Sequence, residues 1–266
     1  MDTSLSRRPL LLSGLLLLLA ACQVGQGTPA SPLRILAYNI RHGAGMDDKL
    51  DLERAAQLIR SHDPDIVTLQ EIDNSCTRTG GVDQAAWLGE ACGLHSAFGA
   101  FMPYQGGEYG MAVLSRYPIL KVHNLRLPDG SEPRIALGIE VLTPQGPVTV
   151  VSIHLYRTEA ERLAQAETLM DYYRDWDHPV VLAGDFNSQP GTAVMQRLAE
   201  DFTEIPCSGN HFTFPADAPE RQIDYCLVRP GSRMHAGSMR VIDEPLISDH
   251  RPLLIELSLG ADALEQ

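Results

Sequence analysis

Carboxylate, amide and imidazole side chains follow several apolar, β-branched runs of this chain, and together they could support metal-assisted cleavage of a phosphate ester. Each lies where a strand is expected to end, so the side chains can meet in one cleft. A hard divalent cation prefers oxygen ligands, and phosphodiester hydrolysis also needs groups that carry protons. The residues of this set are Asn39, Glu71, His154, Asp185, Asn187, Asp224, Asp249 and His250.

Two carboxylates, Glu71 and Asp185, follow apolar runs and are expected to emerge from the edge of a core. A buried carboxylate is costly unless a cation, a hydrogen-bond donor or a proton stabilises it. Taken singly, each could equally be a helix N-cap or a turn residue. Asn39 and Asn187 would separately be read as turn residues. Their joint placement at strand ends favours a single site.

Two histidines are candidates for proton transfer, because imidazole titrates near neutrality. His154 ends the run Val150–His154, and His250 ends Ser248-Asp249-His250. A carboxylate partner would orient either ring and favour its charged form. Either histidine alone could also be an ordinary surface residue. Three consecutive residues cannot converge on one substrate atom, so Ser248-Asp249-His250 is not a serine-protease triad.

Two further segments could contact a substrate. The glycine-rich stretch 106–110, which contains Tyr109, lacks the Gly-Lys-Ser/Thr of a P-loop; it provides either a close backbone approach to the site or a plain turn. Arg134 directly precedes an expected strand. Its guanidinium could bind phosphate, although a surface ion pair is the slightly favoured reading.

The expected elements interleave helices with strands. Helices are predicted around residues 52–59, 84–92 and after the capping box formed by Thr158 and Glu161. The predicted strands cover residues 33–38, 65–69, 111–114, 135–142, 148–153, 180–183, 222–228 and 253–257. Several strands are joined by short turns and must be antiparallel, which excludes a purely parallel sheet. A two-sheet α/β sandwich with helices outside is the arrangement that fits.

Together these motifs resemble those of the endonuclease/exonuclease/phosphatase superfamily, which includes pancreatic-type deoxyribonuclease, abasic-site endonucleases, neutral sphingomyelinases and inositol polyphosphate 5-phosphatases. The resemblance runs from about Leu33 to Leu257, and Gly184-Asp185-Phe186-Asn187 and Ser248-Asp249-His250 are its most specific parts. It implies a DNase I-like fold: a four-layer α/β sandwich of two mixed, mainly antiparallel sheets flanked by helices. This agrees with the arrangement expected from the pattern of elements.

The resemblance also implies a Mg²⁺ site, with Mn²⁺ as an alternative ion. Glu71 matches the principal metal ligand, Asn39 a second metal-site residue, and Asp249 a residue that helps to organise the metal. The segment 107–118 is similar to a bacterial branch that also resembles a domain involved in GPI-lipid remodelling. Met111 departs from that branch, because many relatives carry an asparagine on the phosphate side at this position.

The remaining matches imply roles in the reaction itself. Asp185 and Asn187 match the pair that handles the attacking water and the scissile phosphate. Asp224 matches the carboxylate that orients the terminal histidine, His250. His154 matches a histidine of the phosphodiesterase branches, where abasic-site endonucleases carry a tyrosine.

The N-terminal segment is expected to be a targeting signal that is not part of the fold. Residues 1–21 have a basic head and an apolar run too short to span a bilayer comfortably, and they end in the lipoprotein-like box Leu19-Ala20-Ala21-Cys22. We expect a lipidated Cys22 with a tether to residue 32, a domain over 33–258 and a tail over 259–266. The protein would then be an exported bacterial lipoprotein, with Gln23 favouring the outer membrane. Simple secretion is the alternative.

Charge and cysteine content narrow the function further. The net charge of −13 repels polyanions, which weakens a nucleic-acid reading without excluding it. An oxidising compartment permits disulfides among the other four cysteines, Cys76, Cys92, Cys207 and Cys226, and the three pairings stay open. None of their spacings matches a zinc site.

The sequence thus predicts a metal-dependent phosphodiesterase that acts on a phospholipid, a glycolipid or a small phosphoester at the cell envelope. A lipid-anchored nuclease is the enzymatic alternative, and an inactive binding lipoprotein is the non-enzymatic one. The expected partners are the phosphoester substrate and, through the lipid anchor, the membrane. No protein partner is indicated.

Overall fold

The computed structural model describes Met1, residues 31–229 and residues 234–259. Twelve strands, four α-helices and two 3-10 helices are assigned within these residues. In chain order they are β1 (Leu33–Asn39), η1 (Arg41–Gly43), α1 (Leu52–His62), β2 (Ile66–Asn74), η2 (Thr77–Thr79), α2 (Gln84–Cys92), β3 (His95–Tyr104), β4 (Gly107–Ser115), β5 (Ile119–Arg126), β6 (Ile135–Thr143), β7 (Gly146–His154), α3 (Glu159–Tyr173), β8 (Val180–Asp185), α4 (Ala193–Leu198), β9 (Thr203–Glu204), β10 (Asp224–Arg229), β11 (Met234–Val241) and β12 (Leu253–Leu259).

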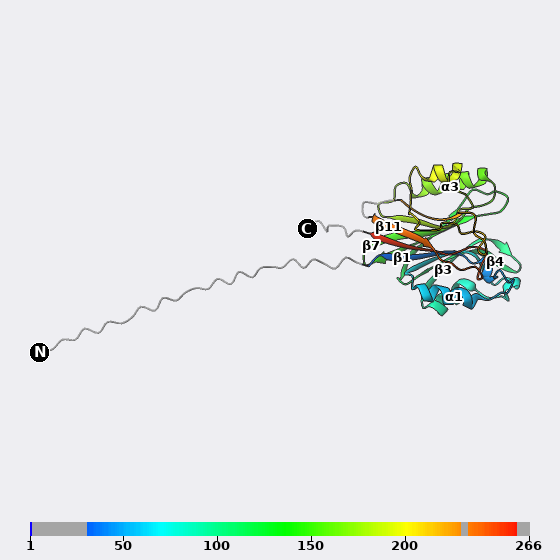
Figure 1. Cartoon of the computed structure of the whole chain (residues 1–266), viewed down its shortest axis with the longest axis horizontal. Coiled ribbons are helices and arrows are strands. Elements are labelled where there is room, and N and C mark those ends of the chain that lie inside the picture. Colours follow the sequence, from blue (N-terminus) through cyan, green and yellow to red (C-terminus); the bar gives the residue numbers. More distant parts are fainter. Residues whose placement is uncertain (2–30, 230–233, 260–266) are drawn as a thin grey trace.

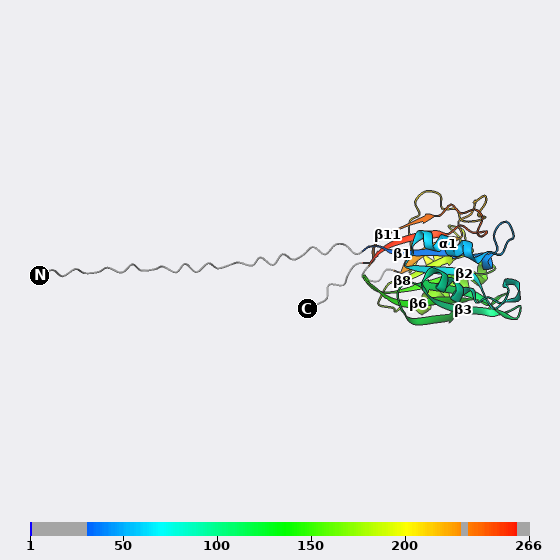
Figure 2. The same cartoon turned by 90° about the horizontal axis from the view of Figure 1, so that it is seen from below.

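The strands form two six-stranded sheets, ordered β11-β12-β1-β2-β4-β3 and β5-β6-β7-β8-β10-β9. Only β1–β2 and β7–β8 are parallel pairs among the described strands; the other pairs are antiparallel. Helices α1 and α3 lie on opposite outer faces of the stacked sheets (Figures 1 and 2). The predicted four-layer α/β sandwich of mixed, mainly antiparallel sheets is therefore confirmed.

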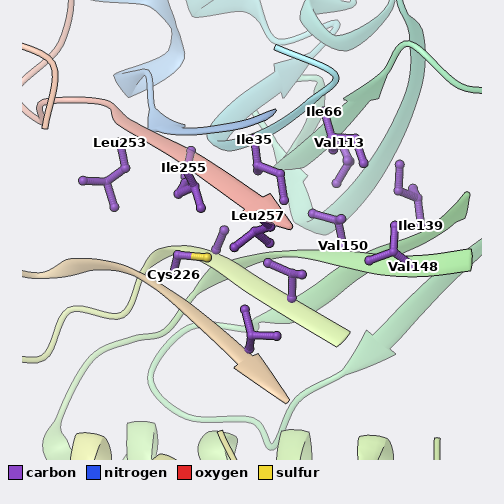
Figure 3. Packing of buried hydrophobic residues seen from close by; sticks show 14 of the residues in the cluster. Ile35, Ile66, Val113, Ile139, Val148, Val150, Cys226, Leu253, Ile255 and Leu257 are labelled. Carbon is purple, nitrogen blue, oxygen red and sulfur yellow. The ribbon is translucent and has the colours of Figure 1, made fainter. Parts of the chain in front are cut away.

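The sandwich holds three apolar layers because the central strands are buried on both faces. Ile35 of β1 points into the core between the sheets, whereas Leu36 packs outward against α1 and α2. The inner layer brings Ile255 and Val113 of one sheet opposite Val150 of the other (Figure 3). Strands covered on both sides read as near-continuous apolar runs, which is why the sequence revealed them.

Two of the helix predictions rest on capping signals that the structure contains. The side chain of Thr158 accepts from the backbone N–H of Glu161, and the Glu161 side chain accepts in return, so the predicted capping box is present at α3. Helix α1 ends at Asp63, which has a left-handed backbone and precedes Pro64. A proline disfavours helical geometry in the residue before it, so the helix cannot continue.

The strand predictions needed correction in two respects. Strand β2 does not end before Glu71 but continues to Asn74, and the pairing register with β4 shifts between Gln70 and Ile72. Strands β3, β5, β9 and β11 were not predicted. Both β3 and β5 have many half-buried or exposed residues, so they lack the continuous apolar signal of the inner strands.

The predicted site residues come together at one end of the sandwich. Register pairs His154 with Asp185 across β7 and β8, and Asp224 with Asp185 across β10 and β8. Asn39 ends β1 in the other sheet. The opposite end of the sandwich contains Leu33, where β1 begins and pairs with β12.

Several predictions concern the N-terminal segment and the cysteines. Cys22 and the predicted signal peptide lie outside the described residues. In the part that is described, no helix is both long and apolar enough to cross a membrane. Cys76, Cys92, Cys207 and Cys226 are all free thiols. The side chain of Cys226 packs in the core between the sheets, which agrees with a structural role.

Candidate active site

Asn39 connects the two sheets at the centre of the candidate active site. Its Nδ2 lies 3.3 Å from Glu71 Oε1 and 3.3 Å from Asp185 Oδ2, so one amide group donates to both carboxylates. Its Oδ1 accepts the backbone N–H of Arg41 at 3.1 Å. In this orientation the amide aligns the two carboxylates, and serving as an oxygen ligand of a metal would require the amide to turn over.

Glu71 occupies the irregular position of β2, not the end of the strand as predicted. Its φ of 62° lies in the left-handed region, which is uncommon for a residue with a side chain. The register shift turns Glu71 away from its expected place in the ladder, and the side chain lines a cavity at this end of the described fold. Such irregularities in strands often re-aim a side chain toward a site.

The chemistry of this corner fits a hard divalent cation. Burial raises the pKa of Glu71, and the nearby carboxylate of Asp249 raises it further. Two carboxylates that repel one another are stabilised by a cation bound between them. Asp249 is partly exposed and is held at its neighbour Ser248, whose hydroxyl lies 3.3 Å from Asp249 Oδ1 and donates to the backbone oxygen of Asn39 at 2.7 Å. Glu71 and Asp249 are therefore the residues that would hold the metal.

Asp185 is the buried carboxylate around which the reacting groups gather. Its Oδ1 accepts the backbone N–H of Asn187 at 2.8 Å, and its Oδ2 lies 3.3 Å from Asn187 Nδ2. The same Oδ2 lies 3.4 Å from His154 Nε2 and 3.7 Å from His250 Nε2. Burial raises the pKa of Asp185 to about 7, although the His250 imidazolium works against this shift.

His250 is held by a second carboxylate on its far side. Its Nδ1 lies 2.9 Å from Asp224 Oδ2, and the Thr213 hydroxyl donates to the same oxygen at 2.5 Å. Burial lowers the pKa of His250, but the carboxylates of Asp224 and Asp185 outweigh burial and raise it to about 10. Near neutral pH this ring is therefore a cation flanked by two acids.

His154 has the opposite electrostatic character. Burial lowers its pKa well below the ordinary value, and the cations of Arg134 and His250 lower it further. Its Nδ1 is buried without a hydrogen-bond partner among the described residues. The site thus pairs a neutral imidazole with a charged one, each within 4 Å of the same Asp185 oxygen.

One ligand atom each from Asp185, Asp224 and His250 lies within 4.8 Å of the others, the spacing of a metal cluster. The hydrogen bond between His250 Nδ1 and Asp224 already uses this geometry. Zinc-type sites use neutral imidazole, whereas this imidazole is charged. The three residues are better described as an imidazolium between two carboxylates, hydrogen-bonded to Asp224 and 3.7 Å from Asp185, than as the place of the cation.

Arg134 is not a surface residue, contrary to the slightly favoured prediction. Only 2% of the residue is exposed, and its guanidinium lies 4.5 Å from the centre of the Phe101 ring and 4.4 Å from that of Tyr156. It pairs with Glu132, and it lines the same cavity as Glu71. The alternative reading, a guanidinium available to a phosphate, is the one that this geometry supports.

That cavity has a volume of about 240 Å³ and opens beside Glu71 and His154. Tyr109, singled out from the glycine-rich stretch, lines it, so that stretch is a strand approaching the site. Met111 does not line it: its side chain packs in the core between the sheets, 3.5 Å from the Ser152 hydroxyl. Its departure from the resembling branch therefore affects the layer beneath the site.

The cavity also contains residues that the sequence did not single out. Arg78 forms a two-pronged ion pair with buried Asp73, through Nε at 2.7 Å and Nη2 at 2.8 Å. Tyr104 and Tyr156 complete the aromatic lining. No strand-end or motif signal marks these residues, because Asp73 lies inside β2 and Arg78 in the short η2 turn.

A hydrogen-bond chain connects Asp73 with the backbone of His42. The imidazole of His42 makes the stability of the fold sensitive to pH. Gln84 accepts the backbone N–H of Asp73 at 2.9 Å and donates to the backbone oxygen of His42 at 2.8 Å. Burial and, to a smaller extent, the guanidinium of Arg78 together lower the pKa of His42 to about 4. The unfolded chain therefore takes up this proton first as the pH falls.

We expect the stabilising effect of neutral His42 to be complete above pH about 6.5 and to be lost as the pH falls through about 4. His42→Asn should make stability fall less steeply over this range, by about 1–2 kcal/mol in total after allowance for partial exposure. Asparagine tolerates the φ of 47° at this position. The measurement is urea unfolding of metal-free protein at several pH values, with His95→Asn, which replaces an exposed histidine, as the control. Parallel curves for the parent and His42→Asn would contradict the assignment.

Known proteins are similar to this chain in sequence. The sequence profile of the endonuclease/exonuclease/phosphatase family matches residues 36–250. The uncharacterized protein YbhP of Escherichia coli K12 is 28% identical over 244 residues, which cover 85% of this chain and 96% of YbhP.

Solved structures give the same result for the fold. The endonuclease/exonuclease/phosphatase of Bacteroides vulgatus superposes with a TM-score of 0.72 at 20% identity, covering 86% of this chain and all of that one. The mannosyl-6-phosphatase Bt3783 of Bacteroides thetaiotaomicron gives a TM-score of 0.67 at 20% identity, covering 85% of this chain and 99% of that one. The profile match extends over most of the sandwich and includes both of its sheets. This chain belongs to the endonuclease/exonuclease/phosphatase family, whose members are generally divalent-metal-dependent phosphoester hydrolases with the DNase I-like fold.

Proposed function

We propose that this chain is a Mg²⁺-dependent phosphodiesterase, with Mn²⁺ as an alternative ion. The observation that carries the proposal is the position of Asn39, whose single amide nitrogen contacts both Glu71 and Asp185. Asn39 thereby connects Glu71, which would bind the cation, with Asp185, around which the proton-transferring residues gather. Two such functions in contact are what metal-assisted hydrolysis of a phosphate ester requires.

When bound at Glu71 and Asp249, the cation would polarise the phosphoryl oxygen and stabilise negative charge on the leaving group. Asp185 would accept the proton of the attacking water, because burial raises its pKa to a value suited to a base at neutral pH. Asn187 fixes that carboxylate through its backbone N–H and would help to hold the water.

The two histidines and Arg134 would act on the phosphate. His250, kept cationic by Asp224, would stabilise the negative charge that develops on the phosphoryl oxygens. His154 would contribute hydrogen bonding as a neutral ring. The guanidinium of Arg134 lines the cavity beside it and could bind an oxygen of the scissile group.

The proposed substrate class rests on the net charge of the chain, the size of the cavity and a structurally similar enzyme. The net charge of −13 disfavours a nucleic-acid polyanion, and a cavity of about 240 Å³ suits a small organic group. The structurally similar Bt3783 is a mannosyl-6-phosphatase, which supports a small phosphoester as the substrate of this chain. We therefore propose a phospholipid or glycolipid headgroup or a related soluble ester as the substrate.

We also propose that the protein is a lipoprotein of the cell envelope, as the Cys22 box indicates. The described chain enters the fold at Leu33, at the end of β1 opposite to Asn39. Seven residues of strand span about 20 Å. An anchor before residue 33 would attach to the far end of the sandwich, so the site would face away from the attachment point. This favours substrates that reach the site from the solvent.

The direct test is hydrolysis of bis(p-nitrophenyl) phosphate by the purified protein with Mg²⁺, with Mn²⁺ and with EDTA. We expect hydrolysis with either ion and none with EDTA. Plasmid DNA at low and high salt forms a second arm, because nicking that falls steeply with salt would favour the nuclease instead. Hydrolysis that EDTA leaves unchanged would overturn the metal-dependent proposal.

A further inference from the structure

The cavity beside the reacting groups has a second half that the reaction does not use. Glu71, Arg134 and His154 line it where the reaction would occur. Arg78, Tyr104 and Tyr109, which are in contact with one another, also line it, and we call the space beside them the second half. When the phosphate of an ester is bound at Glu71 and Arg134, the second half of the cavity is filled either by the organic group of that ester or by water. The residues there therefore determine which organic groups fit.

Arg78 is held rigidly at this place. Asp73, whose side chain is fully buried, pairs with its Nε and Nη2, and Thr79 Oγ1 donates to Asp73 Oδ2 at 3.2 Å. The guanidinium lies 4.6 Å from the centre of the Tyr104 ring and 5.3 Å from that of Tyr109. Within residues 31–229 and 234–259, Nη1 has no hydrogen-bond acceptor, and the side chain is 25% exposed. The two N–H groups of Nη1 are thus free to donate at the cavity wall.

The electrostatics of the cavity indicate what this donor would bind. The charge of Arg78 is neutralised by Asp73, which accepts from two of its nitrogens, whereas Arg134 pairs with Glu132 through Nη1 alone and stays available to the scissile phosphate. An anion gains little from a guanidinium that already has a bidentate carboxylate, whereas a neutral hydroxyl oxygen can still accept its free N–H. The lining therefore favours a group rich in hydroxyls over a second phosphate.

The shape of the lining indicates a ring. Two guanidinium-on-aromatic stacks line the cavity, Arg78 with Tyr104 and Arg134 with Tyr156. Tyr109 joins them, because its ring centre lies 5.4 Å from that of Phe101. Flat aromatic faces beside polar donors suit a ring with apolar faces and a hydroxylated rim. The volume of about 240 Å³ lies below that of pockets for drug-sized ligands and allows a single ring.

Resting on the proposed phosphodiesterase activity, we propose that Arg78 is a specificity-determining residue that donates Nη1 to a hydroxyl of a neutral polyhydroxylated ring on the substrate. The ring, a hexose or a cyclitol, occupies the second half of the cavity, beside Tyr104 and Tyr109. Asp73 is a positioning residue, which orients the guanidinium and cancels its charge.

The test compares matched esters with and without a ring. Glycerophosphoinositol is set against glycerophosphoethanolamine in the parent, Arg78→Lys and the control Arg116→Lys. Arg116 pairs with Asp63 and Asp65 outside the cavity. We expect the parent to prefer the ring esters and Arg78→Lys to lose about 10–100-fold in kcat/KM on them, mainly through KM, which corresponds to one hydrogen bond from a charged donor. Esters without a ring should change by less than about threefold, as should all esters with Arg116→Lys.

A charge variant separates substrate recognition from a structural role. Asp73→Asn leaves the guanidinium unneutralised, so it should shift preference toward glycerophosphoinositol 4-phosphate, whose ring carries an added anion. A purely structural role for the ion pair would not produce this shift. Should Arg78→Lys fail to fold, Tyr104→Leu removes the ring against the same guanidinium and is expected to weaken the ring esters selectively.

Three results would overturn the inference alone: equal losses on all esters in Arg78→Lys, a parent that does not distinguish ring esters, or a parent that prefers the phosphorylated ring. In each case bis(p-nitrophenyl) phosphate is still hydrolysed. Failure to hydrolyse any ester with Mg²⁺ would instead overturn the proposed function, and with it the specificity role.

Discussion

Glu71→Gln is expected to lower kcat/KM for bis(p-nitrophenyl) phosphate by about 1,000-fold or more, because a metal ion contributes several kcal/mol to charge stabilisation in such reactions. The substitution keeps the size of the side chain and its contact with Asn39, but it removes the charge that would bind the cation. Mg²⁺ at about 100 times its Kd should stabilise the parent by about 2.7 kcal/mol and raise its Tm. The variant should show no such rise.

The matched control is Glu53→Gln, which replaces an exposed glutamate paired with Arg60 on α1. It should retain both activity and the Mg²⁺-dependent rise in Tm. Without Mg²⁺, Glu71→Gln should be at least as stable as the parent, since the substitution relieves repulsion from Asp249. A variant that keeps its Mg²⁺ response would show that the cation binds elsewhere, and Asp185, Asp224 and His250 would be the next place to examine.

The sequence predicted the part of the site that depends on regular strands. His154 and Asp185 end two parallel neighbours, so strand pairing alone brings them to one edge, and Asn39 ends a buried strand of the other sheet. The helices α1, α2 and α3 were predictable for a similar reason, because caps and apolar spacing are local signals. Both classes of prediction need only residues that are adjacent in the chain or in the ladder.

The parts that were not predicted depend on tertiary packing. Glu71 reaches the cavity through an irregularity within β2, and nothing in Ile66–Asn74 marks where the register shifts. Arg134 is buried because Phe101 and Tyr156, distant in sequence, cover its guanidinium. A charged residue before a strand is usually exposed, so the sequence favoured the wrong environment.

The same limit explains why Arg78 was not recognised. Its partner Asp73 was expected to lie beyond the end of a strand, where a carboxylate is solvated. In the structure β2 continues through Asp73, so the carboxylate is fully buried and needs a cation beside it. Because β2 extends through Asp73, this buried carboxylate holds Arg78 at the wall of the cavity.

Asp224→Asn is the second substitution for which a large effect is expected. Asp224 does not reach the substrate in the proposed mechanism; it holds the Nδ1 of His250 at 2.9 Å and is a main cause of the raised pKa of that ring. Losing a positioned group that stabilises transition-state charge costs about 100- to 1,000-fold in rate. The loss should appear in kcat more than in KM, because the positive ring acts mainly on charge that develops in the transition state.

The pH profile distinguishes this role from simple packing. In the parent, His250 is cationic below its pKa of about 10, so activity should decline only as the pH rises toward that value. Without the Asp224 charge the pKa falls, and the alkaline limb should move toward neutral pH. Thr213→Val is the matched control, since it removes only a neutral donor to the same carboxylate and should lower kcat by a few-fold at most. An alkaline limb that stays in place in Asp224→Asn would mean that the charge of His250 does not drive the reaction, and the neutral His154 would then be the ring to test.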